Sequence, residues 1–243
     1  MLARAARPDQ VVPGADVWVL PLNSWDTPSD LPRGQAGVDI PRALFGQEEA
    51  VLKKLQTART NGAAFALCGT VGAVGLARKA GLPPMGGFGL NLTNRDALDA
   101  MAEEGLAAAV LSMELTLRQM AFAADPPLPV GLFAYGRQPL MLLRDCPRAM
   151  TAGCSNGAAC SLTDRKGVTF PLACVSGGGT ELLNAVPLFL ADRLAELPPA
   201  DFLYLHFTDE APGDAARILQ NYREGTADKP AAFTRGLYYR GCI

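Results

Sequence analysis

The chain has 243 residues, of which 49% are hydrophobic and 19% are charged, and its formal net charge is −2 at pH 7. This composition excludes a disordered chain, and it provides no overall positive charge for binding phosphates. The chain contains one histidine and six cysteines. A single histidine excludes a zinc site built from several histidines of this chain, such as the H-E-x-x-H helix of metalloproteases.

The N-terminal segment is basic, but no apolar stretch follows it, so it lacks the pattern of a secretory signal peptide. The longest apolar stretches, residues 105–111 and 130–135, are much shorter than the roughly 18–20 residues of a membrane helix. Without a secretory signal, six cysteines in a chain of this length do not suggest a disulfide framework. We therefore expect a soluble, cytoplasmic protein without membrane contact and with reduced thiols.

Local sequence patterns predict a series of short strands and helices in the first third of the chain. These elements are a strand at 17–20, a long loop at 22–40, a helix at 41–58, a strand at 65–68 and a helix at 71–80 that ends at Gly81. A glycine run, Gly69, Gly72 and Gly75, joins the last two elements. Its spacing differs from that of a dinucleotide-binding loop, and we interpret it as close helix–strand packing.

The remainder of the chain continues the same alternation. The predicted elements are a strand at 87–90, a helix capped by Thr93 or Asn94 and ending at Gly105, a strand at 109–112, a helix opened by the capping box 116–119, a strand at 130–135, an irregular stretch at 146–174, a helix at 180–197 kinked by Pro187, a strand at 202–207 and a helix at 213–222. Regular alternation of strands and helices predicts an α/β fold with a parallel sheet and helices outside it.

Four of the six cysteines lie close together in the sequence, with the spacing C-x7-C-x5-C-x13-C: Cys146, Cys154, Cys160 and Cys174. Thiolates are the usual ligands of iron–sulfur clusters and of all-cysteine zinc sites. Nearby basic side chains can offset the thiolate charge: Arg144, Arg148, Arg165 and Lys166. The spacing matches neither a zinc ribbon nor a common ferredoxin, so buried thiols that act as small hydrophobic groups remain the alternative. Cys68 and Cys242 are interpreted as structural.

Two residues are candidates for acid–base catalysis. His206 ends an apolar strand that is followed by Thr208, Asp209 and Glu210, and it can serve either as a base or as a buried structural histidine. Glu114 can act as an acid or a base, or it can pair with an arginine of a neighbouring strand. No G-x-S-x-G sequence is present, so a serine nucleophile of that kind is not expected.

Several motifs, taken in order, resemble peptidase family U32, the collagenase-like protease family. They begin with 87–94, which is similar to a G-x-x-x-N-[VL]-x-N segment, and 111–115, which is similar to L-S-x-E-L. The resemblance continues through the F-x-[HY]-G segment with its following cysteine, D-R-K-G and E-L-L-N, to the C-terminal signature, at 133–141, 144–147, 164–167, 170–172, 181–184, 222–223 and 234–241.

The resemblance implies a (β/α) barrel. Because only about six strands can be identified, we expect a partial barrel: a single U32-type domain, residues 1–243, that forms the rear part of the barrel, with a Cys-rich insertion at 146–174. Residues at or just after strand ends would face the active pole: Asn91, Glu114, Tyr135, Gly136, Arg137 and His206. From this group and the cysteine segment, the substrate-binding candidates are Asn91, Tyr135, Arg137 and Arg165.

The resemblance also implies a cofactor. Members of the family that take part in hydroxylation of tRNA, ribosomal RNA or the ubiquinone ring carry a four-cysteine [4Fe–4S] cluster. The implied ligands here are Cys146, Cys154, Cys160 and Cys174, with zinc or no metal as the alternatives. Many members have a cysteine three residues after the glycine of F-x-[HY]-G, whereas this chain has Pro139, so the fourth ligand must come from the pair Cys154 and Cys160.

Three functional hypotheses follow. The first is an iron–sulfur protein of an RNA hydroxylation pathway, with RNA as its partner. The second is a peptidase with a peptide substrate, as the family name states. The third is a non-catalytic, metal-stabilised scaffold, since a partial barrel would expose strand edges and would need a missing N-terminal half or a second subunit to cover them.

Overall fold

The computed structural model describes residues 1–28, 30, 34–151, 160–175, 179–226 and 228–240. Eight parallel strands form a closed barrel, because the last pairing, between β6 and β7, joins the two ends of the sheet. The strands, in barrel order, are β1 (Leu2–Arg4), β2 (Val17–Pro21), β3 (Ala36–Asp39), β4 (Phe65–Cys68), β5 (Pro84–Gly86), β6 (Ala108–Val110), β7 (Val130–Gly136) and β13 (Phe202–His206). The expected barrel architecture is therefore present, but the expectation of about six strands and a partial barrel is wrong.

Three of the eight strands are missing from the sequence-based prediction: β1, β3 and β5, which ends before the strand predicted at 87–90 begins. β1 lies in the basic N-terminal segment, and β3 lies within residues 22–40, which we predicted to be a loop. Both are short and depend on their neighbours, since β1 pairs with β2 and β13, and β3 pairs with β2 and β4. Long-range pairing of this kind leaves little local signal in a strand of three or four residues.

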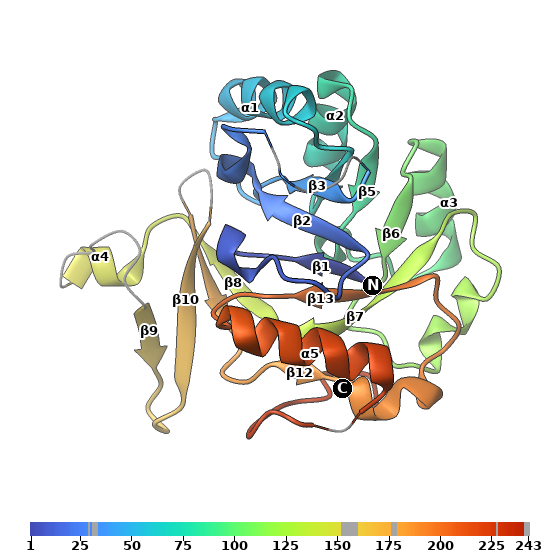
Figure 1. Cartoon of the computed structure of the whole chain (residues 1–243), viewed down its shortest axis with the longest axis vertical. Helices are drawn as coiled ribbons and strands as arrows, with labels where there is room; N and C mark the ends of the chain where they lie inside the picture. The colour runs from blue at the N-terminus through green and yellow to red at the C-terminus, as the bar shows by residue number, and fades with distance from the viewer. Residues whose placement is uncertain (29, 31–33, 152–159, 176–178, 227, 241–243) are drawn as a thin grey trace.

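Helices cover the outside of the barrel (Figure 1): α1 (Glu48–Thr60), α2 (Val71–Ala80), α3 (Arg95–Glu103) and α5 (Pro212–Glu224). The predicted helix boundaries hold where capping groups are present. The Thr70 hydroxyl accepts a hydrogen bond from the Ala73 amide of α2, and Gly81 ends the helix with a φ of 74°. Asn94 caps α3 by accepting from the Ala97 amide at 2.9 Å.

Short stretches of 3-10 helix occupy several of the remaining connections: η1 (Pro8–Gln10), η2 (Leu22–Trp25), η3 (Phe88–Leu90), η4 (Gln119–Ala123) and η5 (Ala191–Glu196). The strand predicted at 87–90 is wrong, because the strand ends at Gly86 and η3 follows it. The capping box is confirmed in its hydrogen bonds between Thr116 and Gln119, but the helix that it opens is only the short turn η4.

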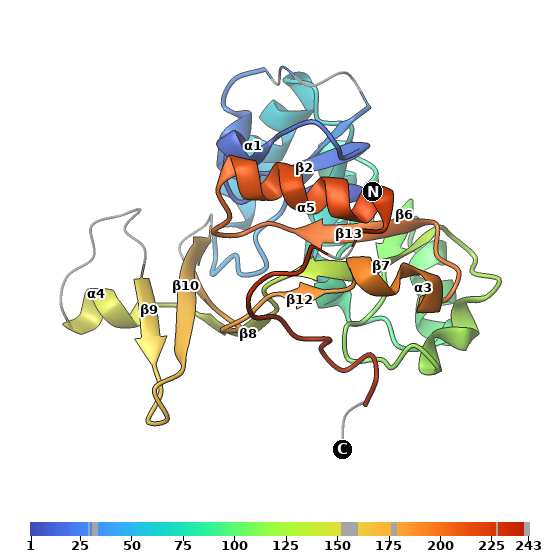
Figure 2. The ribbon, with the colours of Figure 1, turned by 60° about the horizontal axis from the view of Figure 1, so that its bottom comes forward.

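The connection between β7 and β13 forms a second, smaller sheet. Its four antiparallel strands have the order β8–β11–β10–β9: β8 (Pro139–Leu143), β9 (Cys160–Thr163), β10 (Thr169–Val175) and β11 (Gly179–Leu183). We call this segment, residues 139–183, the insertion sheet; it also contains α4 (Pro147–Thr151). In both views α4, β9 and β10 stand away from the barrel (Figures 1 and 2).

The helix predicted at 180–197 is wrong. Residues of this segment form β11, then β12 (Leu188–Phe189), which pairs antiparallel with β7, and then η5. β11 lies between β10 and β8 and is hydrogen-bonded to both. The apolar spacing of this segment is compatible with a helix, but pairing with β10 and β8 makes its first part a strand. Short apolar stretches commonly allow both structures.

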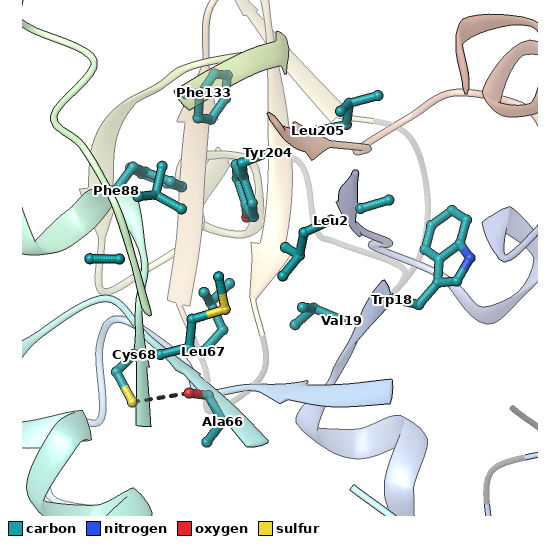
Figure 3. Packing of buried hydrophobic residues seen from close by; sticks show 14 of the residues in the cluster. Leu2, Trp18, Val19, Ala66, Leu67, Cys68, Phe88, Phe133, Tyr204 and Leu205 are labelled. Atoms are coloured by element: carbon teal, nitrogen blue, oxygen red, sulfur yellow. Dashed lines mark hydrogen bonds between the residues drawn. The ribbon is translucent and has the colours of Figure 1, made fainter. Parts of the chain in front are cut away.

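The barrel interior has an apolar layer beneath a polar one. Leu2 and Arg4 point to the same side of β1, and Tyr204 and His206 point to the same side of β13, because side chains alternate along a strand. Leu2, Val19, Leu67, Phe133 and Tyr204 pack together inside the barrel (Figure 3). The polar layer of Arg4, Asp39 and His206 therefore lies at the carboxyl ends of the strands. Within the described residues, no helix combines the length and apolarity needed to cross a bilayer.

Candidate active site at the barrel mouth

A cavity of about 50 Å³ lies at the carboxyl ends of the barrel strands. Arg4, Asp39 and His206 line it from the ends of β1, β3 and β13. The loops after β4 and β5 contribute backbone around Gly69 and Gly89. This pole is where active sites of parallel β/α barrels are found, since the loops there are free to vary without disturbing the strands. We call this space the inner cavity.

Two arginine–carboxylate pairs surround the inner cavity. Nε of Arg4 lies 3.0 Å from an Asp39 oxygen, and both side chains are largely buried. Arg42 and Glu181 form a looser pair, with 3.5 Å between Nη1 and Oε1. With all four groups ionised, the cavity wall carries no net charge.

Burial of both carboxylates sets their protonation. It raises the pKa of Asp39, and the opposing influence of Arg4 and Arg42 is smaller. Burial likewise raises the pKa of Glu181 against the attraction of the same two arginines. Each carboxylate is thus able to take up a proton more readily than an exposed one.

His206 is 4% exposed and contacts the cavity through its ring. Its Nδ1 lies 3.0 Å from the Tyr204 hydroxyl, which fixes the ring orientation, and Phe88 packs edge-on against it. Burial and the nearby Arg4 and Arg42 lower its pKa well below the ordinary value of 6.5, so the ring is neutral at pH 7. Its Nε2 is buried without a hydrogen-bond partner among the described residues.

Arg42 crosses the cavity mouth in a fixed position. Its guanidinium carbon lies 5.3 Å from the centre of the Phe88 ring, and its buried Nε also has no hydrogen-bond partner in the described part of the chain. Two glycines leave room for it. A Cβ at Gly69 would lie 2.8 Å from Cγ of Arg42, and a Cβ at Gly89 would lie 3.0 Å from its Nε.

The glycine run is therefore only partly explained by packing. Gly69 accommodates Arg42, whereas Cβ atoms built at Gly72 and Gly75 would have no neighbour within 4 Å. The interpretation that all three glycines allow close helix–strand packing is wrong for the two that lie in α2.

A larger pocket of about 530 Å³ adjoins the inner cavity and shares Arg42, Phe88 and Gly89 with it. We call it the outer pocket. Its wall combines amide and apolar side chains with one acid and one further arginine: Asn91, Met113, Glu114, Gln138, Leu140, Asn184, Leu237 and Arg240. The two spaces together form a site with a small polar end and a wider, mixed body.

The structure divides the predicted catalytic and binding residues between different places. His206 is in the inner cavity, and Asn91 and Glu114 line the outer pocket. Asn91 adopts a left-handed conformation, with φ 52° and ψ 48°, and accepts a hydrogen bond from the Ser112 hydroxyl through its side-chain oxygen. Because the Asn91 oxygen accepts this hydrogen bond, the orientation of the side-chain amide is set, and its nitrogen remains a donor.

Tyr135 and Arg137 lie instead in a separate pocket of about 540 Å³ beside α5. The Tyr135 hydroxyl donates to Glu210 at 2.9 Å, and Arg137 pairs with Asp209 at 3.1 Å and donates to the Asn184 carbonyl. Burial, followed by the Glu210 charge, raises the pKa of Tyr135, so the hydroxyl remains protonated. Arg165 is exposed in the turn between β9 and β10 and lines none of the three pockets described here.

The cysteine segment is part of the insertion sheet rather than irregular. Cys146 precedes α4, Cys160 begins β9 and Cys174 lies near the end of β10, whereas Cys154 lies outside the described residues. Burial raises the pKa of Cys174, and the charges of Cys146 and Cys160 raise it further. Among the described residues alone, no group of three or more His, Cys, Asp or Glu side chains is arranged to hold a metal ion.

The insertion sheet also reaches the inner cavity. Cys174 pairs in register with Thr180, and the next residue on each strand, Val175 and Glu181, lines the cavity. Cys174 is therefore one residue from the cavity wall along β10, and its side chain lies on the opposite face of the sheet from Val175 and Glu181, because side chains alternate along a strand. Cys68, by contrast, is buried in the barrel wall, where its thiol donates to the Ala66 carbonyl and burial raises its pKa to about 12.

Sequence reasoning missed most of the inner cavity: Arg4, Asp39, Arg42, Glu181 and Tyr204. Arg4 and Asp39 end β1 and β3, which were not predicted. A signal for Asp39 was present, since an acidic residue follows the apolar run 36–38 directly. Glu181 was placed in a helix, and no local pattern relates it to Arg42, its partner 139 residues earlier in the chain.

The fold and the cavity together define the chain as an eight-stranded β/α-barrel protein with a polar cavity at the carboxyl ends of its strands. No family model and no curated protein matches its sequence. A solved structure described as the U32 peptidase Mk0906 superposes with a TM-score of 0.47 and 10% sequence identity, covering 87% of this chain and 93% of that chain. Membership of the U32 peptidase family stays a proposal that rests on the sequence motifs.

Proposed function

We propose that the chain is a U32-family barrel enzyme of an RNA hydroxylation pathway, with an iron–sulfur cluster on the insertion sheet and its reaction centre in the inner cavity. The observation that carries the proposal is that Cys174 lies one residue along β10 from Val175, which lines the cavity. A cytoplasmic setting, in which the thiols stay reduced, belongs to the same proposal.

Three of the four proposed ligands lie in the described part of the chain. The charges of Cys146 and Cys160 act on Cys174, and thiolate sulfur is the preferred ligand of iron–sulfur clusters. These three residues and Cys154 would hold the proposed cluster, and a bound cluster would supply electron transfer. Zinc on the same four thiols is the alternative outcome.

The residues of the inner cavity would bind and orient the reacting group. Arg4 and Arg42 can attract an anionic oxygen, and neutral His206 can exchange a proton through its unpartnered Nε2. Burial of the whole cluster strengthens each of these interactions, because water does not screen them.

RNA contact would come from basic residues outside the cavity. Of the arginines noted in the sequence, Arg137 is engaged with Asp209, and Arg144 stacks over the Phe45 ring at 5.6 Å. Arg165 and Lys166 are exposed in the β9–β10 turn and are the best placed for phosphates.

Anaerobic purification tests the cluster. We expect a coloured protein with about four iron and four sulfide per chain, and loss of both in Cys146→Ala and Cys174→Ala. Cys68→Ala is the matched control, since this thiol lies in the barrel wall and should leave the iron content unchanged. A colourless, iron-free protein in which both variants remain folded contradicts the cluster.

The pathway is tested by mass spectrometry of nucleosides from tRNA and ribosomal RNA of cells with and without the gene. We expect a nucleoside one oxygen atom heavier than its parent to disappear on deletion and to return with the wild-type gene. Complementation by His206→Gln should fail. Identical nucleosides in both strains contradict the RNA assignment.

A peptidase is the second candidate, because neutral His206 and Glu181 could activate a water molecule. None of the described residues that line the inner cavity is a serine, threonine or cysteine, so the hydroxyl or thiol nucleophile of serine, threonine and cysteine peptidases is not available there. Cleavage of gelatin or casein that is lost in His206→Gln would favour this candidate. The scaffold hypothesis was based on the exposed strand edges of a partial barrel. In the closed barrel β6 and β7 pair with each other, so this basis is absent.

A further inference from the structure

We propose that Tyr204 is a positioning residue that keeps the ring proton of His206 on Nε2, so that the histidine presents a hydrogen-bond donor, rather than a base, to the inner cavity. The inference deepens the proposed function, because it assigns the chemistry of His206 in the same cavity. The part of His206 in the reaction rests on that function, whereas the position of the ring proton does not.

Strand β13 places the two rings together. Tyr204 and His206 are two residues apart, so both point to the inside of the barrel, and the phenol oxygen lies 3.0 Å from Nδ1. Both side chains are buried, with exposed fractions of 0% and 4%. Phe88 and Phe133 each pack against both rings, with 5.6–6.3 Å between ring centres. These contacts hold the phenol and the imidazole in a fixed relation.

The hydrogen bond between the two rings has two possible directions. Either the phenol donates to Nδ1, which leaves the ring proton on Nε2, or Nδ1 carries the proton and donates to the phenol oxygen. A phenol O–H is a stronger donor than a neutral imidazole N–H, and an imidazole nitrogen is a more basic acceptor than a phenol oxygen. The first direction therefore gives the stronger hydrogen bond.

The second direction would also leave the phenol proton without an acceptor. Among the described residues, Nδ1 is the one hydrogen-bond partner of the Tyr204 hydroxyl. The charge of Asp39 acts on Tyr204, but this carboxylate accepts its hydrogen bond from Arg4. A buried donor without an acceptor is unfavourable, and Tyr204 has no exposed surface at which water could accept. In the first direction the unpartnered donor is instead Nε2–H, on a residue of the cavity wall.

The charges of the cavity wall exclude a second ring proton. Arg4 and Arg42, together with burial, keep the imidazole neutral at pH 7 by lowering its pKa. A neutral imidazole has one basic lone pair, and the hydrogen bond from Tyr204 occupies it at Nδ1. Nε2 therefore has no lone pair with which to accept a proton from water.

This arrangement distinguishes the two candidate functions. A peptidase that uses His206 to activate water needs a lone pair at Nε2. An N–H group at the same position can orient and polarise a hydrogen-bond acceptor on the reacting group of a substrate. The assignment therefore disfavours the peptidase, and it requires a hydrogen-bond acceptor on the group that enters the inner cavity.

The single histidine provides a direct test, since every imidazole signal in an NMR spectrum of the untagged protein belongs to His206. Protein labelled with ¹⁵N-histidine is measured at pH 7 by long-range ¹H–¹⁵N correlation, in which the protonated and unprotonated ring nitrogens have well-separated shifts. We expect two distinct nitrogen signals, with the proton on Nε2. A proton on Nδ1, a proton on both nitrogens, or two signals averaged by tautomer exchange overturns the proposal.

A matched pair of tyrosine variants separates positioning from a structural role. Tyr204→Phe removes only the hydroxyl, and we expect the two nitrogen signals to shift toward each other, because Nδ1 no longer has a donor that favours one tautomer. Tyr222→Phe removes another buried hydroxyl, which accepts from the Leu190 amide and donates to the Ala134 carbonyl, and it should leave the His206 signals unchanged. Unchanged signals in Tyr204→Phe, or equal changes in both variants, contradict the role of Tyr204.

The measurement on the wild type needs no variant, so it stays decisive if Tyr204→Phe does not fold. It also needs neither RNA nor iron, so its failure is distinguishable from failure of the proposed function. In the complementation experiment, Tyr204→Phe should yield less of the nucleoside that is one oxygen atom heavier, whereas Tyr222→Phe should restore it. Full restoration by a folded Tyr204→Phe with an altered tautomer contradicts the role of the proton in the reaction.

Discussion

The surroundings of His206 disfavour the protonated form of its ring. It is 4% exposed, faces two arginines and touches the aromatic rings of Phe88 and Phe133. The ring is held by Tyr204 on one nitrogen and is open to the cavity on the other. A proton on both nitrogens would place a third positive charge beside Arg4 and Arg42, which explains why its pKa falls.

This burial predicts a pH dependence of stability. The unfolded chain binds a proton at His206 near pH 6.5, whereas the folded chain does so only at a much lower pH, so lowering the pH below 6.5 favours unfolding. Between pH 7.5 and 5.5, the free energy of unfolding of the wild type should fall by about 1 kcal/mol more than that of His206→Gln. Urea unfolding at both pH values measures the difference. Equal losses in the two proteins would show that His206 has the same pKa in the folded and unfolded chains, which contradicts the prediction.

Gly89 and Gly75 make a matched pair of glycine substitutions. A Cβ at Gly89 would lie 2.6 Å from the Gly69 carbonyl oxygen, which is backbone and cannot move aside, so Gly89→Ala should destabilise by about 2 kcal/mol. Gly75 is exposed within α2 and has free space, so Gly75→Ala should stabilise by about 0.5–1 kcal/mol. Thermal unfolding checks both, and a neutral Gly89→Ala would mean that the β4 and β5 loops are not held together.

At the scale of elements, the segment after α5 is attached to the barrel by a few specific groups. Arg235 binds both oxygens of Asp192 in η5, at 2.6 and 2.7 Å, and Lys229 lies 2.9 Å from the same carboxylate. The Tyr238 hydroxyl donates to the Phe133 carbonyl. This segment provides one wall of the outer pocket through Leu237 and Arg240.

Removal of the Asp192 charge should loosen that wall. The Arg235 hydrogen bonds keep the pKa of Asp192 far below its ordinary value, so the pair contributes stability above about pH 4 that is lost as the pH falls further. Asp192→Asn should cost about 1–3 kcal/mol at pH 7 and expose the C-terminal segment to proteases. Limited proteolysis and urea unfolding measure these effects. Asp214→Asn, in the exposed pair with Arg217, is the control and should change neither.

The insertion sheet shows where local patterns fail at this scale. Helices α2 and α3 could be predicted because their caps, Thr70 and Asn94, and the stop at Gly81 act within a few residues. β11 could not be predicted, because its backbone pairs with β10 on one side and β8 on the other. Only that pairing places Glu181 in the cavity rather than on a helix surface.

At the scale of the whole molecule, the N-terminal strand completes the barrel. β1 lies between β13 and β2, so the first and last barrel strands in the sequence are neighbours. Leu2 and Ala3 are buried in the core, and Arg4 belongs to the polar layer that lines the inner cavity. Barrel closure and cavity formation therefore depend on the same three residues.

Deletion of residues 1–7 should open the barrel. We expect loss of a cooperative urea transition and binding of a hydrophobic dye, because the edges of β13 and β2 and the apolar interior become accessible. Arg7→Gln, which removes surface contacts while β1 remains, is the control and should unfold cooperatively. Cooperative unfolding of the truncated chain would mean that β1 is dispensable for closure.

The sequence by itself determined the alternation of strands and helices, the helix caps, the thiol cluster and His206 as a group of interest, because each depends on residues close together in the chain. The number of barrel strands, the identity of the inner cavity and the approach of the insertion sheet to it were decided only by the tertiary structure. Arg4, Asp39, Glu181 and His206 lie far apart in sequence, and strand pairing alone brings them to one layer. The counts of one histidine and six cysteines limit the kinds of catalytic and metal site that the chain can form. Closure of the barrel forms the inner cavity, where the histidine lies.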